Sequence, residues 1–144
     1  MVPSNRPVGT PEARSVQPPP PLLVVDDDAG GSAATRVALV DGGYTVATEC
    51  GGDEVLRLVR ASLMRMVVSE LYIPCGEGRC LVTALKQDRM RLPRLCVLVH
   101  TRHSTPHDLE WALAAGADTV VPKPARDGVL LREVGRLLGD GEAT

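Results

Sequence analysis

The sequence predicts an α/β fold in which helices cover both faces of a doubly wound, five-stranded parallel sheet. Between residues 22 and 138, short apolar segments alternate with longer segments of helical periodicity. The short segments are apolar throughout, which is typical of parallel strands buried on both faces. Right-handed crossovers through the intervening helices then give a doubly wound sheet. The chain of 144 residues is long enough for one such domain and a tail.

Five segments rich in aliphatic and β-branched residues are the predicted strands. They are residues 22–25, 44–48, 66–69, 95–100 and 119–122. The last strand contains Pro122, which has no backbone N–H to donate to a neighbour, so we expect it at an edge of the sheet.

An amphipathic segment follows each predicted strand and is the predicted helix that covers it. These helices are residues 32–40, 53–62, 78–88, 106–115 and 128–138. Gly42 and Gly43 end the first helix, and Gly116 is placed to cap the C-terminus of the fourth. Asp53 and Glu54 lie in the first turn of the second helix, where the helix dipole favours negative charge.

Residues 1–21 form a separate proline-rich arm with few apolar residues, and residues 22–140 form the folded domain. This composition predicts a disordered or polyproline-type arm, because too little apolar surface is present to build a core.

Composition excludes several classes of function. The net charge of −2 gives no overall field that would favour nucleic acid or an anionic membrane. No apolar stretch reaches the roughly 20 residues that a membrane span needs, and the N-terminus lacks a signal-peptide hydrophobic region. The four cysteines show no C-x-x-C spacing, so we expect reduced thiols and a cytoplasmic location.

Charged or hydroxyl side chains stand at the ends of four predicted strands. They are Asp26 and Asp27 after the first, Glu70 after the third, Thr101 after the fourth and Lys123 after the fifth. The carboxyl ends of parallel strands meet at one edge of the sheet, where ligands of such folds bind. We therefore expect acids and a lysine to converge at a site suited to a phosphoryl group.

The order and spacing of these motifs resemble those of a bacterial response-regulator receiver domain over about residues 22–138. The matching segments are Val24–Asp28, Ile73–Gly78, Leu98–Thr101, Ala115–Asp118 and Lys123–Pro124. The resemblance implies the strand order 2-1-3-4-5 and a role in phosphorelay signal transduction, without a conventional enzyme activity. The family usually has a cis Lys-Pro bond, so the bond between Lys123 and Pro124 is expected to be cis.

The resemblance also implies a role for each residue of the cluster. Asp27 would be a direct ligand of Mg²⁺, and Asp26 would bind the ion directly or through water. The backbone carbonyl of Tyr72 would be a third metal contact. Thr101 and Lys123 would bind the phosphoryl group, which the metal helps to neutralise.

Three residues depart from the family pattern. Glu70 replaces the aspartate that accepts the phosphoryl group, and its extra methylene moves the carboxylate outward by about 1.5 Å. Arg102 stands where the family has a small residue that leaves room for the phosphoryl group, and Val120 stands where it has a switching aromatic. We therefore predict a pseudo-receiver in which Glu70 reaches Lys123 and imitates part of the phosphorylated state. In that case Glu70 can fill the place of the Mg²⁺ ion.

Two other functions remain open from the residues alone. A working phosphoacceptor receiver could use Asp26 or Asp27 in place of Glu70. A phosphatase of the haloacid-dehalogenase type is suggested by the spacing of Asp26 and Asp28, but Gly30 stands where that family has Thr or Val.

The resemblance implies a protein partner: a histidine kinase, a regulator or a scaffold. In receivers, the face formed by the fourth helix, fifth strand and fifth helix contacts such partners. Leu109, Trp111 and Leu113 on the fourth helix cannot all be buried, so an exposed Leu or Trp there is a candidate anchor. The alternative is that Trp111 packs sideways against a neighbouring helix.

Overall fold

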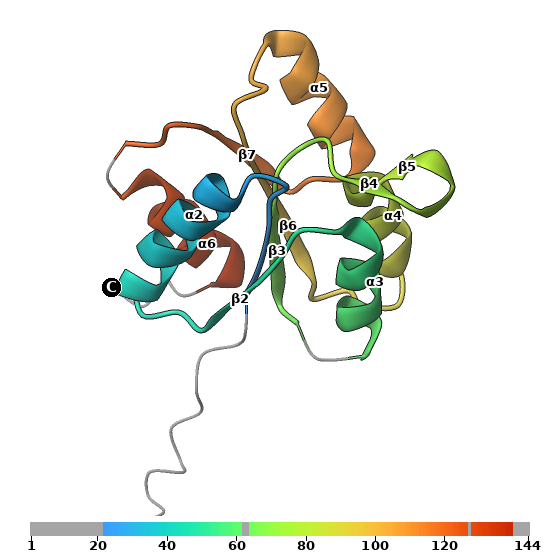
Figure 1. Ribbon diagram of the computed structural model, residues 1–144, viewed down its shortest axis with the longest axis horizontal. Helices are drawn as coiled ribbons and strands as arrows, with labels where there is room; N and C mark the ends of the chain where they lie inside the picture. Colours follow the sequence, from blue (N-terminus) through green and yellow to red (C-terminus); the bar gives the residue numbers. More distant parts are fainter. Residues whose placement is uncertain (1–21, 62–63, 127, 140–144) are drawn as a thin grey trace, which may run out of the picture.

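The computed structural model describes residues 22–61, 64–126 and 128–139, so the predicted arm at residues 1–21 lies outside the described residues. A five-stranded parallel sheet forms the centre of the domain, with strand order β2-β1-β3-β6-β7 (Figure 1). The strands are β1 (Leu22–Val25), β2 (Val46–Glu49), β3 (Met66–Ser69), β6 (Cys96–Thr101) and β7 (Thr119–Pro122). The predicted fold class and strand order are confirmed.

Five helices cover the sheet in two layers (Figure 1). They are α2 (Ala29–Asp41), α3 (Gly52–Ala61), α4 (Leu81–Asp88), α5 (Pro106–Ala115) and α6 (Val129–Leu138). Helices α2 and α6 pack on one face through a core that includes Leu39 and Val134, while α3, α4 and α5 pack on the other. Because successive residues of β1 point to opposite faces and all are buried, this strand is apolar throughout.

The predicted start of the helix at residue 78 is wrong. A short antiparallel hairpin, β4 (Pro74–Cys75) and β5 (Arg79–Cys80), joined by a 3-10 turn, precedes α4. Gly78 has φ +72°, a left-handed conformation that an α-helix does not contain. The helix begins at Leu81, whose backbone N–H donates to the carbonyl of Ile73 at 2.8 Å.

The first helix begins three residues earlier than predicted, at Ala29. The carboxylate of Asp28 accepts a hydrogen bond from the backbone N–H of Gly31 at 3.1 Å and so caps the helix. The cap offsets the low helix propensity of the two glycines in the first turn.

Several predicted details are confirmed. Strand β7, which carries Pro122, is an edge of the sheet. Gly116 ends α5 with φ +120°, and the bond between Lys123 and Pro124 is cis. At the other end of α5, Thr105 and Asp108 form a reciprocal capping box. In the part of the chain that the structure describes, no helix is long and apolar enough to cross a membrane.

Replacing Leu85 with alanine should lower the free energy of unfolding by about 2–5 kcal/mol, because this α4 side chain is fully buried and its loss leaves a cavity. Leu113→Ala is the matched control, since it removes the same atoms from a helix position that is 54% exposed. We expect the control to change stability by about 0.5 kcal/mol. Urea unfolding measures both, and equal losses would contradict the core described above.

Candidate functional site

The carboxyl ends of β1 and β3 bring Asp26 and Glu70 together. These strands are neighbours with Val25 opposite Ser69, and each acid is the next residue along its strand. The backbone N–H of Glu70 donates to the carbonyl of Val25 at 2.9 Å, which continues the ladder to the site. The sheet register therefore fixes the two acids side by side.

Lys123 lies between the two acids. Its Nζ is 2.6 Å from Oδ2 of Asp26 and 3.2 Å from Oε1 of Glu70. The side chains of Lys123, Asp26 and Glu70 are only 13%, 5% and 12% exposed. The backbone N–H of Lys123 donates to the carbonyl of Thr101 at 2.8 Å, which fixes the position of the lysine. One ammonium thus pairs with two sheltered carboxylates.

The second oxygen of Glu70 is also occupied. The hydroxyl of Thr101 donates to Oε2, and the backbone N–H of Leu71 donates to the same atom at 3.1 Å. Thr101 is fully buried, and its oxygen accepts a hydrogen bond from the N–H of His103 at 3.0 Å. Both oxygens of Glu70 therefore have donors from the protein itself.

Gly31 in the first turn of α2 allows this close arrangement. A Cβ at that position would lie 2.6 Å from Oδ2 of Asp26 and 3.2 Å from Nζ of Lys123. Any other residue would force the ion pair to move, so the packing at this position requires glycine.

Asp27 and Tyr72 lie at the rim of the cluster. Together with the three ion-paired residues they line a small cavity of about 180 Å³, which Asp28, Arg102 and His103 complete. The side chain of Asp27 is exposed. The Tyr72 hydroxyl donates to Oδ1 of Asp108 at 2.6 Å, and this bond lowers the pKa of Asp108 and raises the pKa of Tyr72.

The carboxylate of Asp26 is already engaged in this arrangement. Oδ2 of Asp26 is taken by Lys123, and Oδ1 accepts the backbone N–H of Asp28 at 2.9 Å. No group of three His, Cys, Asp or Glu residues within the described ranges is arranged to hold a metal ion. The metal contacts expected at Asp26, Asp27 and the Tyr72 carbonyl therefore stay a prediction.

Sequence reasoning missed His100, the residue before Thr101 on β6. It is 8% exposed, and its side chain points to the α2 and α6 face, opposite to that of Thr101. Its Nδ1–H donates to the carbonyl of Val121 at 2.8 Å, and burial lowers the pKa of the ring. The available signal was a histidine inside an otherwise apolar strand.

The other sequence-predicted residues take different positions. Trp111 is half-buried with its ring centroid 5.6 Å from that of Tyr72, whereas Leu113 is 54% exposed. Trp111 therefore packs sideways, and Leu113 is the exposed residue of the predicted anchors. Val120 is half-buried against the core, and Arg102 is exposed.

Comparison with known proteins identifies the family and the fold of this domain. The model of the response regulator receiver domain matches residues 22–135. The DNA-binding transcriptional regulator NtrC of Salmonella typhimurium is 36% identical over 90 residues, which cover 60% of this chain and 18% of that protein. The response regulator SaeR of Staphylococcus aureus is 29% identical over 67% of this chain and 40% of its own length. This chain therefore matches less than half of each of these relatives.

Solved structures are similar over most of the domain. A putative response regulator from Chloroflexus aurantiacus has a TM-score of 0.74 and 23% identity over 84% of this chain and 98% of its own. The signal receiver domain of a histidine kinase from Syntrophus aciditrophicus has a TM-score of 0.71 and 27% identity, covering 87% and 94% of the two chains.

Replacing Lys123 with methionine should lower the free energy of unfolding by about 3 kcal/mol, because two sheltered carboxylates would lose the cation between them. The chain contains one other lysine, Lys86, which is exposed and donates to the carbonyl of Ala114. Lys86→Met is the control, with an expected change of about 0.5 kcal/mol.

A double variant, Lys123→Met with Glu70→Gln, should recover part of the loss, because it removes one of the uncompensated charges. Urea unfolding of the four proteins completes the measurement. A Lys123→Met variant as stable as the parent protein would show that the ion pairs contribute nothing to folding.

Proposed function

Because this chain belongs to the response regulator receiver domain family, we propose that it acts in two-component signalling as a pseudo-receiver. It works by binding other proteins and does not accept a phosphoryl group at Glu70. The observation that carries the proposal is the closed set of contacts around the Glu70 carboxylate, in which Lys123 and Thr101 bind the acid itself.

The chemistry of phosphoryl transfer explains why these contacts matter. An attacking carboxylate must point along the line of the transferred group, and a misplacement of about 1 Å can cost about 100-fold in rate. Glu70 carries one methylene more than aspartate, which extends the side chain by about 1.5 Å. Its two oxygens are directed at Lys123 and at the Thr101 hydroxyl, the groups that would otherwise bind the incoming phosphoryl oxygens.

The same contacts support a domain held in one signalling conformation. A carboxylate bound to Lys123 and Thr101 reproduces part of the interactions of a phosphorylated acid. It supplies one negative charge, whereas a phosphoryl group supplies nearly two. The domain would therefore present its binding surface without a phosphorylation signal.

A working receiver that uses Asp27 is the second candidate. Asp27 is exposed and lines the same cavity, so a phosphoryl donor could reach it. Asp26 is a poorer acceptor because Lys123 and the N–H of Asp28 occupy its two oxygens. The phosphatase alternative is disfavoured, because the carboxylate of Asp28 caps α2.

The proposed partner surface is the face formed by α5, β7 and α6. Leu113 on α5 offers an exposed apolar side chain there, suited to anchoring a histidine kinase, a regulator or a scaffold. Trp111 stabilises the same helix from the other side by packing on Tyr72.

Treatment with acetyl phosphate and Mg²⁺ should leave the mass of the parent protein unchanged and should add one phosphoryl group to Glu70→Asp. The shorter acid would withdraw from Lys123 and Thr101 and free them for the phosphoryl oxygens. Intact-mass spectrometry gives the result, with Glu70→Gln as a control that has no carboxylate. A phosphoryl group on the parent protein, mapped to Asp27, would support the second candidate instead.

Leu113→Asp should recover much less of the partner that copurifies with the parent protein from its native cells. The reason is that a charged side chain would replace the apolar one at the contact. Met90→Asp is the matched control: Met90 is 86% exposed but lies after α4, away from the proposed face. Quantitative mass spectrometry compares the recovered proteins. Equal losses from both variants would contradict the assignment of the face.

A further inference from the structure

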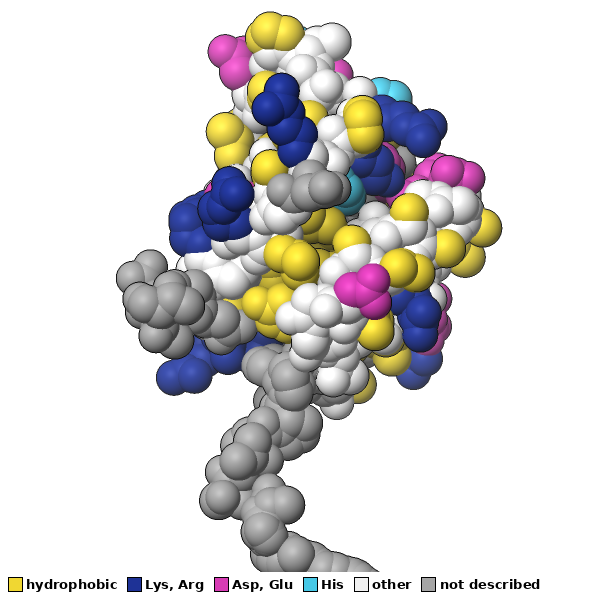
Figure 2. Space-filling model, turned by 90° about the vertical axis from the view of Figure 1, so that its left-hand side faces the viewer, with side chains coloured by type: hydrophobic (Ala, Val, Ile, Leu, Met, Phe, Trp, Pro, Cys, Tyr) yellow, Lys and Arg dark blue, Asp and Glu magenta, His cyan; other side chains and the backbone are white. Residues whose placement is uncertain are grey.

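A second, larger cavity lies between α2 and α6. Its volume is about 720 Å³, within the range of about 300–1,000 Å³ that is usual for small-molecule sites. Figure 2 looks onto this side of the molecule and shows hydrophobic side chains gathered around a central hollow. The cavity adjoins the acid cluster where Asp28, Arg102 and Lys123 line both.

The cavity exists because α2 carries small residues where it faces α6. Gly30, Gly31, Ala34 and Ala38 line it from α2, and Leu130 and Leu131 line it from α6. At the C-terminal end of α2 the helices close together, since a Cβ on Gly42 would lie 2.3 Å from a methyl group of Leu131. Packing of α2 on α6 thus closes the space at the C-terminal end of α2.

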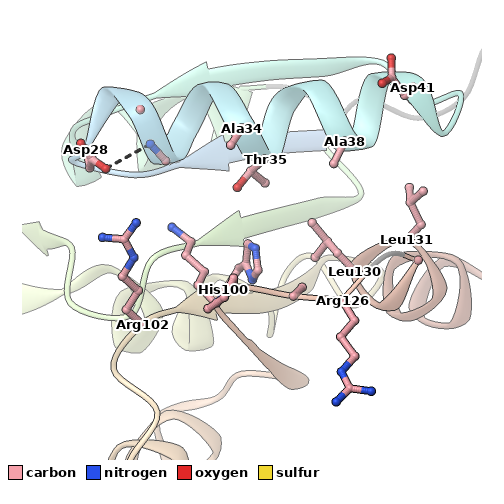
Figure 3. A pocket seen from close by; sticks show the side chains of 16 residues that line it. Asp28, Ala34, Thr35, Ala38, Asp41, His100, Arg102, Arg126, Leu130 and Leu131 are labelled. Atoms are coloured by element: carbon pink, nitrogen blue, oxygen red, sulfur yellow. Dashed lines mark hydrogen bonds between the residues drawn. The ribbon is translucent and has the colours of Figure 1, made fainter.

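Two buried polar side chains point into this apolar space. Figure 3 shows Thr35 directed from α2 and the ring of His100 directed from β6 toward each other across the cavity. They are 6% and 8% exposed. Both residues line the cavity. A hydroxyl and an imidazole nitrogen on the wall of an apolar cavity can each form a hydrogen bond with a bound molecule.

The protonation of His100 sets the chemistry of that molecule. Nδ1 carries the proton that it donates to the Val121 carbonyl, and burial lowers the pKa of the ring, so the ring is neutral near pH 7. Nε2 then accepts a hydrogen bond and cannot donate one. A ligand hydroxyl satisfies both groups, because it donates to His100 and accepts from Thr35.

Charge at the mouth favours an uncharged ligand. Lys123 is already neutralised by Asp26 and Glu70, and Arg126 points away from the cavity in Figure 3. Arg102 extends toward Asp28, whose carboxylate lies on the same rim. Apart from Lys123, the lining carries Asp28 and Asp41 against Arg102 and Arg126, so neither sign of charge is in excess.

We propose that the cavity between α2 and α6 binds a small, uncharged molecule with an apolar body and a hydroxyl group. The apolar body lies against Ala34, Ala38, Leu130 and Leu131. Since Lys123 and Pro124 also line the cavity, the bound molecule touches the residue that holds Glu70. Glu70 does not line this cavity, so the proposed binding is independent of whether Glu70 is phosphorylated.

The test titrates the purified protein with 4-ethylphenol and with its isomer 4-methylanisole, which has the same atoms but no hydroxyl donor. Methyl NMR spectra report on the alanine and leucine side chains of the cavity. We expect saturable shifts confined to these methyl groups, with the phenol binding about fivefold more tightly because of its hydrogen bonds. Equal affinities for the two isomers, or an absence of shifts in these methyl groups, would overturn the proposal.

Three variants and one charged probe sharpen the result. Ala38→Phe should abolish binding by filling the space, while Ala33→Phe on the exposed side of the same helix should leave it unchanged. Thr35→Val should weaken the binding of 4-ethylphenol about fivefold, because it removes the hydroxyl that donates to the ligand oxygen. Tighter binding of 4-ethylbenzoate than of 4-ethylphenol would contradict the proposal that the ligand is uncharged.

Discussion

The ammonium group of Lys123, held between the carboxylates of Asp26 and Glu70, is the interaction on which the carboxyl edge of the sheet depends. Two sheltered acids side by side repel each other and tend to bind protons unless a cation compensates them. Here the cation is built into the chain and positioned by the backbone bond to Thr101. The glycine at position 31 leaves the space that this arrangement needs.

The charges that surround Lys123 come from the chain itself. In the family to which this chain belongs, the resemblance implies that a metal ion and a phosphoryl group supply these charges from outside. In this chain the positions around Lys123 and Thr101 are satisfied by Glu70. The proposed site between α2 and α6 would then give the domain an input that requires no covalent chemistry, because it reaches the same lysine from the other side of the sheet.

Much of this arrangement follows from the sequence, because parallel strands bring their ends to one edge. The apolar runs ending at Asp26 and Glu70 predict both the sheet and the cluster, and the strand order follows from the resemblance to receivers. The hairpin before α4 was missed, since its left-handed Gly78 lies inside a segment with helical periodicity. His100 was missed for a different reason: the function of a buried polar residue depends on the gap opposite it, and that gap is created by small residues on a helix distant in sequence.

The hydrogen bond between Tyr72 and Asp108 has a mechanical consequence. Tyr72 follows the acid-bearing end of β3, and Asp108 belongs to the capping box at the start of α5. One side chain thereby ties the loop beside Glu70 to the first turn of a helix on the proposed partner surface. A displacement of that loop would move the carboxylate of Asp108 and weaken the cap of α5. The tyrosine therefore couples the position of the loop beside Glu70 to the start of this helix.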